Sequence, residues 1–477
     1  MTARRSPWRG VICWALVGVA LLGVFLALVF RMPLLSATGL ERSGASTTVP
    51  PTLFDPPPTP SSQPQLAAPV GPIAAASQAP DGPIPDRDVL EQRLQGIDIK
   101  ALQKGVPEGG NLVTAYQVLD SATGDVLAQS SPDQLLIPAS NAKLLTITAV
   151  LHAFEATDVF DTTVVMPEPG RLVLVGGGDP LLASAKTDAY PGPASLEELA
   201  ATTAEVLRAK GLTTITLGYD ASLFQESWAS TWPATYRDQV TPISALWADE
   251  GRDANKVRST DPALDAATIF AASLKTQGIT VDGVPAAATG SGEEVARVSS
   301  PGVHALAEQA MEHSNNSYTE VLGMQLALKQ GKPATFAGTA AAVQEVLTGL
   351  GLWHEGATLR DGSGLSRENQ VPVSMLARVA RHVAITPRLE VVQDGFPVAG
   401  VSGSLNDRFS DDISAPARGI ARAKTGTLSL VSTLSGTTVT ADGREVVFAF
   451  ATNGSTDGWA ARVWADHGVG IITGCGC

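Results

Sequence analysis

Residues 137–151 predict a helix that is buried on several sides, and a helix of this kind needs a core around it. Pro138 suits the first position of such a helix, because its missing backbone N–H would be unpaired there in any case. The residues that follow are apolar at spacings that bury much of the helix, namely Leu144, Leu145, Ile147, Val150 and Leu151. We therefore expect the chain to fold around this helix.

The same helix carries a serine and a lysine, Ser140 and Lys143, whose spacing of three residues places them on one face. A serine hydroxyl becomes nucleophilic when a neighbour takes its proton, and a lysine whose pKa is lowered by burial or by nearby positive charge can act as that base. No other lysine in the chain follows a serine at this spacing. The pair predicts acyl-transfer chemistry, and a helix N-terminus with a solvated lysine is the alternative.

The length and composition allow two or three folded units and argue against nucleic acids and metals as partners. The chain has 477 residues, of which 44% are hydrophobic, so real cores can form. Its formal net charge of -14 argues against nucleic-acid phosphates as partners. The cysteines Cys13, Cys475 and Cys477 provide neither a disulfide framework nor a zinc spacing, so we expect no metal and no other cofactor. A bond between Cys475 and Cys477 and a pair of free thiols are both open alternatives.

The N-terminus predicts a membrane signal. Three arginines in residues 1–9 precede an uncharged apolar run at 10–30, which has about the 20 residues of a spanning helix. We expect 1–9 in the cytoplasm, 10–30 as a transmembrane anchor, and the rest on the outer face of the membrane. A cleaved signal peptide, cut near Ser36-Ala37-Thr38, is the alternative. Residues 31–85 are rich in Pro, Ser and Ala and predict a disordered spacer.

Helix and strand patterns mix along the rest of the chain. Residues 88–102 have the spacing of an amphipathic helix, and 113–119 with 126–129 flank a turn-rich segment typical of a hairpin. Further strands are predicted at 162–166, 171–175 and 214–219, and further helices at 195–210 and 261–278. The glycines at 176–178 lack the spacing of a phosphate-binding loop and predict a tight turn.

A second chemical stretch, residues 312–318, lies where a helical pattern begins. It holds Ser314 and Asn316, a hydroxyl and a carboxamide that can relay a proton and hold a peptide amide. A polar helix cap is the alternative. Ser404-Leu405-Asn406 repeats the pattern, so the pattern alone does not identify a site.

A third stretch, Ala423-Lys424-Thr425-Gly426-Thr427, precedes strand-like segments at 430–440 and 446–453. On an edge strand, Lys424 and Thr425 can present a cation and a hydroxyl to a substrate carboxylate. Gly426 would let a substrate backbone approach closely. A solvated strand start is the alternative.

Ser-x-x-Lys, Ser-x-Asn and Lys-Thr-Gly, in this order, resemble the motifs of penicillin-binding proteins and serine β-lactamases. More specifically, the chain is similar to the D-alanyl-D-alanine carboxypeptidase/endopeptidase family of low-molecular-mass class C penicillin-binding proteins, peptidase family S13. Ser404 lies in one of the accessory stretches of this family, which removes it as the second catalytic serine. The resemblance rests on Pro138-Ala139-Ser140, Val175-Gly176-Gly177-Gly178-Asp179-Pro180, Asp361-Gly362-Ser363-Gly364-Leu365-Ser366-Arg367, Gly400-Val401-Ser402-Gly403-Ser404-Leu405 and Lys424-Thr425-Gly426-Thr427-Leu428.

This resemblance implies an α/β (α+β) fold, with a penicillin-binding, serine β-lactamase-like domain whose antiparallel sheet is flanked by helices. We expect residues 86–160 and 296–477 to form this domain and 161–295 to form one smaller inserted domain. The interval between Ser140 and Ser314 is shorter than in the best-known members, so a second insertion should be absent or reduced. The resemblance also implies the bacterial cell envelope as the location.

The resemblance implies that Ser140 attacks the carbonyl between the last two D-alanines of a peptidoglycan stem peptide while Lys143 accepts its proton. Ser314 would relay that proton to the leaving amine, and Lys424 should lower the pKa of Lys143 because like charges disfavour protonation. Water then hydrolyses the acyl-enzyme, whereas β-lactams should acylate the serine and leave slowly. Asn315 replaces the usual middle aspartate, but this side chain is not expected to reach the substrate.

By the same resemblance, the remaining site residues bind substrate. Asn316 would hold the peptide amide, and Lys424 with Thr425 the terminal carboxylate. Gly426 would admit the substrate backbone. The backbone N–H groups of Thr427 and of the nucleophilic serine would form the oxyanion hole.

Other functions share some of these features. A serine β-lactamase must deacylate quickly, and no local Glu-x-x-x-Asn pattern lies in the right place for it. A non-catalytic wall-binding protein could keep the same fold. A Ser-His-Asp hydrolase is disfavoured because no G-x-S-x-G elbow occurs, and His313 beside Ser314 would point about a quarter turn away on a helix. The sequence does not decide between carboxypeptidase and endopeptidase cleavage.

Overall fold

The computed structural model describes residues 82–477. The expected cytoplasmic segment at 1–9, the expected anchor at 10–30 and the expected spacer up to residue 81 lie outside this range. Within residues 82–477, no helix is both long and apolar enough to cross a membrane.

The first sheet is antiparallel and joins the start of the described chain to its end. Its strand order is β2-β1-β10-β9-β8. β1 and β2 form the predicted hairpin, in whose turn the Asp120 carboxylate accepts the Thr123 N–H at 2.7 Å. β1 also pairs with β10, so strands far apart in the sequence become neighbours. The strands are β1 (Val113–Asp120), β2 (Val126–Ser130), β8 (Arg422–Leu428), β9 (Val431–Val439) and β10 (Glu445–Asn453).

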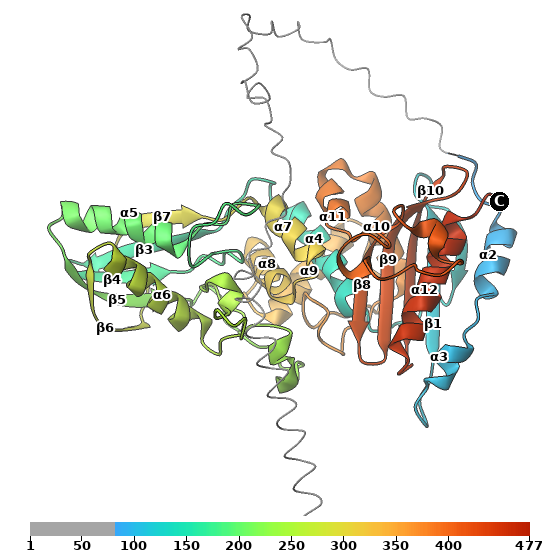
Figure 1. Cartoon of the computed structure of the whole chain (residues 1–477), viewed down its shortest axis with the longest axis horizontal. Coiled ribbons are helices and arrows are strands. Elements are labelled where there is room, and N and C mark those ends of the chain that lie inside the picture. Colours follow the sequence, from blue (N-terminus) through green and yellow to red (C-terminus); the bar gives the residue numbers. More distant parts are fainter. Residues whose placement is uncertain (1–81) are drawn as a thin grey trace, which may run out of the picture. The chain divides into compact units, whose positions relative to one another are not determined.

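Both faces of this sheet are covered by helices. Successive side chains of a strand point to opposite faces, and on β10 both sets are buried. Val447, Ala449 and Ala451 join the core shared with α4 and α10 (Val373–Ile385), whereas Val446, Phe448 and Phe450 join the core under α2 (Arg87–Gln95) and α12 (Gly458–Thr473). Figure 1 shows α12 lying against β9 and β10. The sheet is therefore the middle layer of three.

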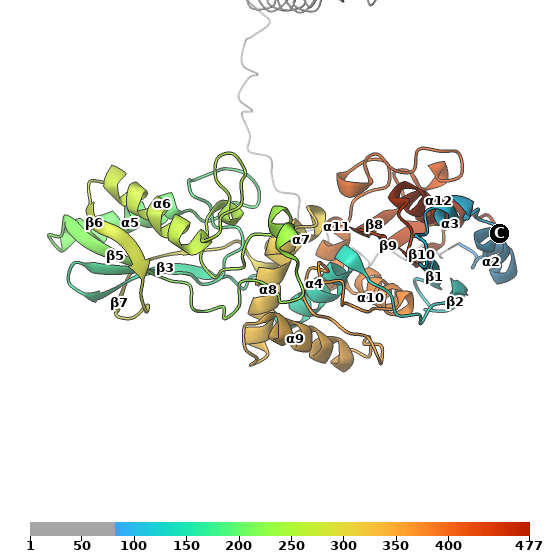
Figure 2. The same ribbon diagram turned by 90° about the horizontal axis from the view of Figure 1, so that it is seen from below.

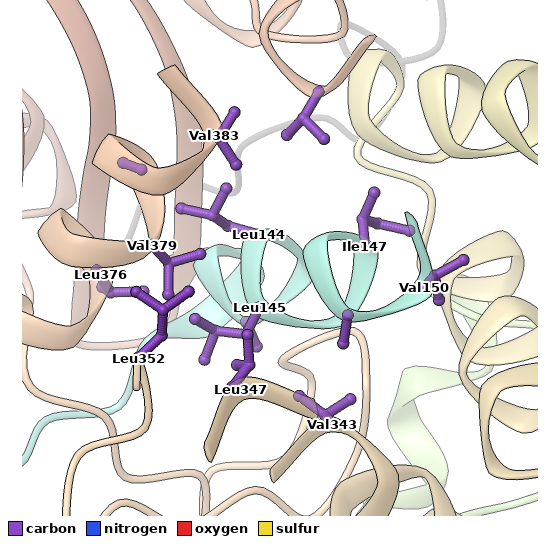
Figure 3. Packing of buried hydrophobic residues seen from close by; sticks show 14 of the residues in the cluster. Leu144, Leu145, Ile147, Val150, Val343, Leu347, Leu352, Leu376, Val379 and Val383 are labelled. Carbon is purple, nitrogen blue, oxygen red and sulfur yellow. The ribbon is translucent and has the colours of Figure 1, made fainter. Parts of the chain in front are cut away.

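The predicted central helix is present as α4 (Ala142–Ala153), and residues 142–151 are all buried. Figure 3 shows Leu144, Leu145, Ile147 and Val150 pointing from α4 into side chains of the surrounding helices. One detail of the prediction is wrong, because Pro138 precedes a single 3-10 turn, η2 (Ala139–Asn141), and the α-helix begins only after it. The neighbours of α4 are α7 (Val303–Glu312), α8 (Asn316–Lys329), α9 (Phe336–Gly349), α10 and α11 (Glu390–Asp394).

The amphipathic helix expected at 88–102 is two helices in the structure, α2 and α3 (Lys100–Lys104). The C-cap of α2 is Gly96, and Asp98 Oδ1 accepts the Lys100 N–H at 2.8 Å where α3 begins. The helix is therefore broken between residues 96 and 99 despite the continuous apolar spacing.

A second, mixed sheet lies between α4 and α7 in the chain. Its strand order is β6-β5-β4-β3-β7, in which β5 runs parallel to both β4 and β6. Its first strand starts at Asp161, the predicted start of the insertion, and its last strand ends at Ser299, four residues beyond the predicted end. Helices α5 (Leu196–Ala209) and α6 (Pro262–Thr276) pack on it, and Figure 2 shows α6 beside β5. The strands are β3 (Asp161–Glu168), β4 (Arg171–Val175), β5 (Thr214–Asp220), β6 (Thr280–Ala287) and β7 (Glu293–Ser299).

The tight turn predicted at the glycine run after β4 is not found there, because residues 176–179 form neither turn nor bend and the chain turns only at 180–181. Another side chain approaches the run closely. Gln325 Nε2 on α8 donates to the carbonyls of Gly177 at 2.6 Å and Gly178 at 3.3 Å. Gly178 has a φ of +81°, and a Cβ there would collide with the Gln325 amide. At the C-terminus, Cys475 and Cys477 are joined by a disulfide.

Candidate active site

Ser140 lies in the 3-10 turn η2, and the turn is anchored to the first sheet. Asn141 Nδ2 donates to Thr433 Oγ1 on β9 at 2.6 Å, and the same hydroxyl donates to Pro138 O at 2.8 Å. Ala139 adopts a left-handed φ of +46°, which costs a residue with a Cβ about 1–3 kcal/mol. The surrounding contacts therefore hold this serine in a conformation that the local sequence alone does not favour.

Lys143 is fully buried directly beside the serine. Its Nζ lies 3.1 Å from Ser140 Oγ, 2.6 Å from Asn316 Oδ1 and 2.7 Å from Ser363 O. The last two atoms only accept hydrogen bonds, whereas a hydroxyl can accept or donate. A neutral amine satisfies all three partners by donating twice and accepting the serine proton, and an ammonium satisfies them by donating three times. A proton can therefore pass between Ser140 and Lys143 without rearrangement.

Burial lowers the pKa of Lys143 to about 7, while the carboxylates of Glu320 and Asp361 oppose this shift. Of the two expected causes, burial and a nearby positive charge, burial is the larger. Burial also lowers the pKa of Lys424, and the charge of Lys143 lowers it further. A neutral Lys143 removes one of the two causes that disfavour the ammonium form of Lys424.

Ser314 lies between α7 and α8 with a left-handed φ of +49°. Its hydroxyl accepts from Lys424 Nζ at 2.7 Å. The next residue, Asn315, caps α8 by accepting the Tyr318 N–H at 3.0 Å, and its Nδ2 donates to Glu250 Oε2 at 3.0 Å. An aspartate at this position would cap the helix equally well but would face the Glu250 carboxylate. Asn315, where an aspartate is usual, can therefore donate a hydrogen bond to Glu250 that an ionised aspartate could not.

Asn316 has one contact on each side of its carboxamide. Its Oδ1 accepts from Lys143, as described above, and its Nδ2 donates to Gln239 O at 3.0 Å. One amide hydrogen remains for a ligand. Asn316 thus orients the lysine as well as facing the site, a contact that the sequence-based prediction did not include.

Lys424, Thr425, Gly426 and Thr427 lie on β8, which is an edge strand. Lys424 is fully buried, and its Nζ also donates to Thr425 O at 2.9 Å. The Thr425 hydroxyl is 2.7 Å from that of Ser404, so the accessory stretch around Ser404 touches the site. A Cβ at Gly426 would lie 2.8 Å from Pro138 O and 3.1 Å from the backbone N of the nucleophilic serine. Thr427 is exposed beside it.

Two residues with no predicted role contact the site directly: Ser363 through Lys143 and Gln239 through Asn316. Two others, Glu320 and Asp361, act on Lys143 through their charge. Glu320 follows Asn316 by one helical turn on α8, and an acidic residue within an apolar helix is a signal that could have identified it. Asp361 and Ser363 lie in one of the stretches that carry the family resemblance, but no role was predicted for either residue. Within residues 82–477, no group of three or more His, Cys, Asp or Glu side chains is placed to hold a metal ion.

The D-Ala-D-Ala carboxypeptidase 3 (S13) family model matches residues 97–258 and 253–473. The chain belongs to this family. This confirms the family predicted from the motifs and the predicted enzyme class, a serine-type D-Ala-D-Ala carboxypeptidase.

Three relatives illustrate the similarity of this S13 carboxypeptidase to known proteins. It is 31% identical to carboxypeptidase DacB of Mycolicibacterium smegmatis, over 99% of either chain. It is 28% identical to a D-alanyl-D-alanine carboxypeptidase of Actinomadura, over 72% of this chain and 78% of the relative. Penicillin-binding protein 4 of Haemophilus influenzae has a similar structure, with a TM-score of 0.64 and 21% identity over 78% of this chain and 98% of the other. This likeness confirms the predicted fold class, and the relatives are consistent with an enzyme of the bacterial cell envelope.

Proposed function

We propose that this S13 carboxypeptidase removes the terminal D-alanine of peptidoglycan stem peptides with Ser140 as the nucleophile. The serine oxygen bonds to the carbonyl carbon between the two D-alanines while Lys143 takes the hydroxyl proton. As the peptide C–N bond breaks, Ser314 passes its proton to the leaving amine. The proton that Lys143 took from Ser140 then replaces it on Ser314. Water then attacks the ester, releases the shortened peptide and returns a proton to Ser140. The 3.1 Å separation of Ser140 Oγ and Lys143 Nζ carries this proposal.

We further propose that β8 binds the substrate through several groups. Lys424 uses two of its three ammonium hydrogens on Ser314 Oγ and Thr425 O, which leaves one for the terminal carboxylate. The Thr425 hydroxyl would bind the same carboxylate. Gly426 leaves room for the substrate backbone, and the N–H of Thr427 would form the oxyanion hole together with that of the nucleophile. The free amide hydrogen of Asn316 would hold the peptide carbonyl.

The location and the domain organisation are further parts of the proposal. Residues 10–30 would anchor the enzyme, so that it works on the outer face of the cytoplasmic membrane. Residues 86–160 and 296–477 would form the catalytic domain, with 161–295 and the end of β7 as the insertion. The partners would be peptidoglycan stem peptides and, as inhibitors, β-lactams. An endopeptidase activity on cross-linked peptides would use the same groups.

A fluorescent penicillin tests the assignment of the nucleophile. We expect persistent labelling of the parent enzyme, none of Ser140→Ala, and full labelling of Ser374→Ala, whose hydroxyl instead contacts Asp133. Persistent labelling of Ser140→Ala would reject the assignment. Rapid turnover of nitrocefin would favour a β-lactamase, and an unlabelled but folded parent would favour a wall-binding protein.

Mass analysis of digested muropeptides separates the two cleavage activities. Loss of one alanine from monomers means carboxypeptidase action, whereas conversion of dimers to monomers means endopeptidase action. The Ser140→Ala variant is the control, since both products should disappear together.

A further inference from the structure

A buried carboxyl group lies on the far side of the backbone turn that contacts Lys143. Glu320 on α8 is fully buried, and each of its oxygens accepts one backbone N–H. Oε1 accepts from Ser363 N at 2.7 Å and Oε2 from Gly362 N at 3.0 Å. The carbonyl of that same Ser363 accepts from Lys143 Nζ at 2.7 Å. Glu320 and Lys143 therefore hydrogen-bond to the same short backbone segment, Gly362 and Ser363, from two sides.

The rest of this turn is fixed by other groups. Asp361 accepts from Gly364 N at 2.9 Å, Ser366 N at 2.5 Å, Trp232 Nε1 at 2.7 Å and Asn369 Nδ2 at 2.8 Å, so its carboxylate holds the far part of the turn. The Thr146 hydroxyl, one turn after Lys143 on α4, donates to Gly362 O at 2.7 Å. The two peptide groups before the Ser363 carbonyl are thus held by Glu320 and Thr146.

We propose that Glu320 is a positioning residue for the base: it fixes the Ser363 carbonyl against the Lys143 amine, and its charge biases the protonation of that amine. This inference rests on the proposed role of Lys143 as the base. A carboxylate suits the position because two donors converge on it. A glutamine would offer one oxygen and one NH₂ group, and the NH₂ group would face a backbone N–H.

The charge of Glu320 acts against burial. Desolvation favours the neutral amine, and a nearby carboxylate favours the ammonium. Burial and the neighbouring Asp361 raise the pKa of Glu320 itself to about 8. Glu320 and Lys143 therefore titrate over a similar range of pH. Removing Glu320 therefore increases the fraction of neutral Lys143 in the part of this pH range where Glu320 is ionised.

The test measures the rate of acylation by a fluorescent penicillin across pH 5–9. The rate is normalised to the amount of enzyme that becomes labelled, so that unfolded molecules do not count. We expect Glu320→Gln to slow acylation by about 10- to 100-fold, because the carbonyl shifts. We also expect the midpoint of the acid limb to move toward lower pH by a fraction of a pH unit, because Glu320 is only partly ionised over this range. A slower rate with an unchanged acid limb would indicate a purely structural role and overturn the proposal, as would a rate equal to that of the parent enzyme.

Two threonine variants keep the proposal testable if Glu320→Gln folds poorly. Thr146→Val preserves the side-chain shape and the charge but releases Gly362 O, so acylation should slow several-fold with no shift of the acid limb. Thr148→Val is the matched control on the same helix, since its buried hydroxyl has no hydrogen-bond partner among residues 82–477. Equal rates for the two threonine variants would overturn the positioning role. Ser140→Ala, measured in parallel, separates the two hypotheses: if it still labels, the proposed nucleophile is wrong, and if it does not, only the role of Glu320 is in question.

Discussion

Substituting Gly426 by alanine tests how closely the edge strand approaches the nucleophile. The added Cβ would overlap Thr433 Oγ1 and would lie 2.8 Å from Pro138 O and 3.1 Å from Ser140 N. Two of these atoms, the threonine hydroxyl and the proline carbonyl, form one of the bonds that tie the serine turn to β9. Overpacking of this kind costs about 1–3 kcal/mol of folding stability.

The effect on the rate should exceed the effect on stability. The methyl group pushes β8 away from the Ser140 N–H, which is one proposed oxyanion donor, and losing one such donor costs about 100-fold or more in rate. We therefore expect Gly426→Ala to acylate with a fluorescent penicillin about 100-fold more slowly, in stopped-flow or gel-based time courses. Thermal unfolding in parallel should show a modest loss of stability.

Gly349→Ala is the matched control. Gly349 ends α9, and a Cβ there would meet no atom of the described part of the chain within 4 Å. This variant should keep the acylation rate and gain up to about 1 kcal/mol of stability. If Gly426→Ala were destabilised but acylated within twofold of the parent rate, the placement of the oxyanion hole would be refuted. A parent-like stability and rate would refute the close approach itself.

The remaining predictions concern charge. Because the pKa of Lys143 is lowered to about 7, acylation should accelerate as the pH rises through 7, and a rate independent of pH from 5 to 9 would exclude Lys143 as the base. Asn315→Asp adds a carboxylate facing Glu250; the pKa of the new acid is then raised on folding, so the variant should be destabilised at pH 8 and regain stability as the pH falls toward 5. Thermal melts check this, and a Glu250→Gln background should remove the effect. Lys424→Ala should lower kcat/KM about 10- to 100-fold for peptides with a free terminal carboxylate and clearly less for their amides, and equal losses would count against carboxylate binding.

Periodicity and motif chemistry predicted the parts of the fold that local sequence controls. The buried helix after Ser140 and the hairpin of β1 and β2 follow from patterns a few residues long. The edge position of Lys424, which was only assumed, depends on the order of strands from distant parts of the chain. Two of the errors lie at helix ends. The C-cap Gly96 ends α2 within the expected helix at 88–102, and the turn η2 separates Pro138 from α4.

The groups around Lys143 could not be predicted because their partners lie far away in the sequence. Glu320 meets Ser363 and Asn316 meets Gln239 only once α8, the turn at 361–366 and the loop before α6 are packed together. The extent of the burial that lowers the lysine pKa has the same origin, because the helices around α4 come from distant parts of the chain.

The order of the strands also determines when the enzyme can first act. Ser140 and Lys143 lie in the first part of the described chain, but β8, β9 and β10 close the sheet from its last part. A ribosome has therefore made almost the whole chain before Thr433 can fix the serine turn and before Lys424 can reach Ser314. An interrupted chain that stops before residue 422 carries the nucleophile without the strand that completes its site, so unfinished products of synthesis should be inert toward penicillin.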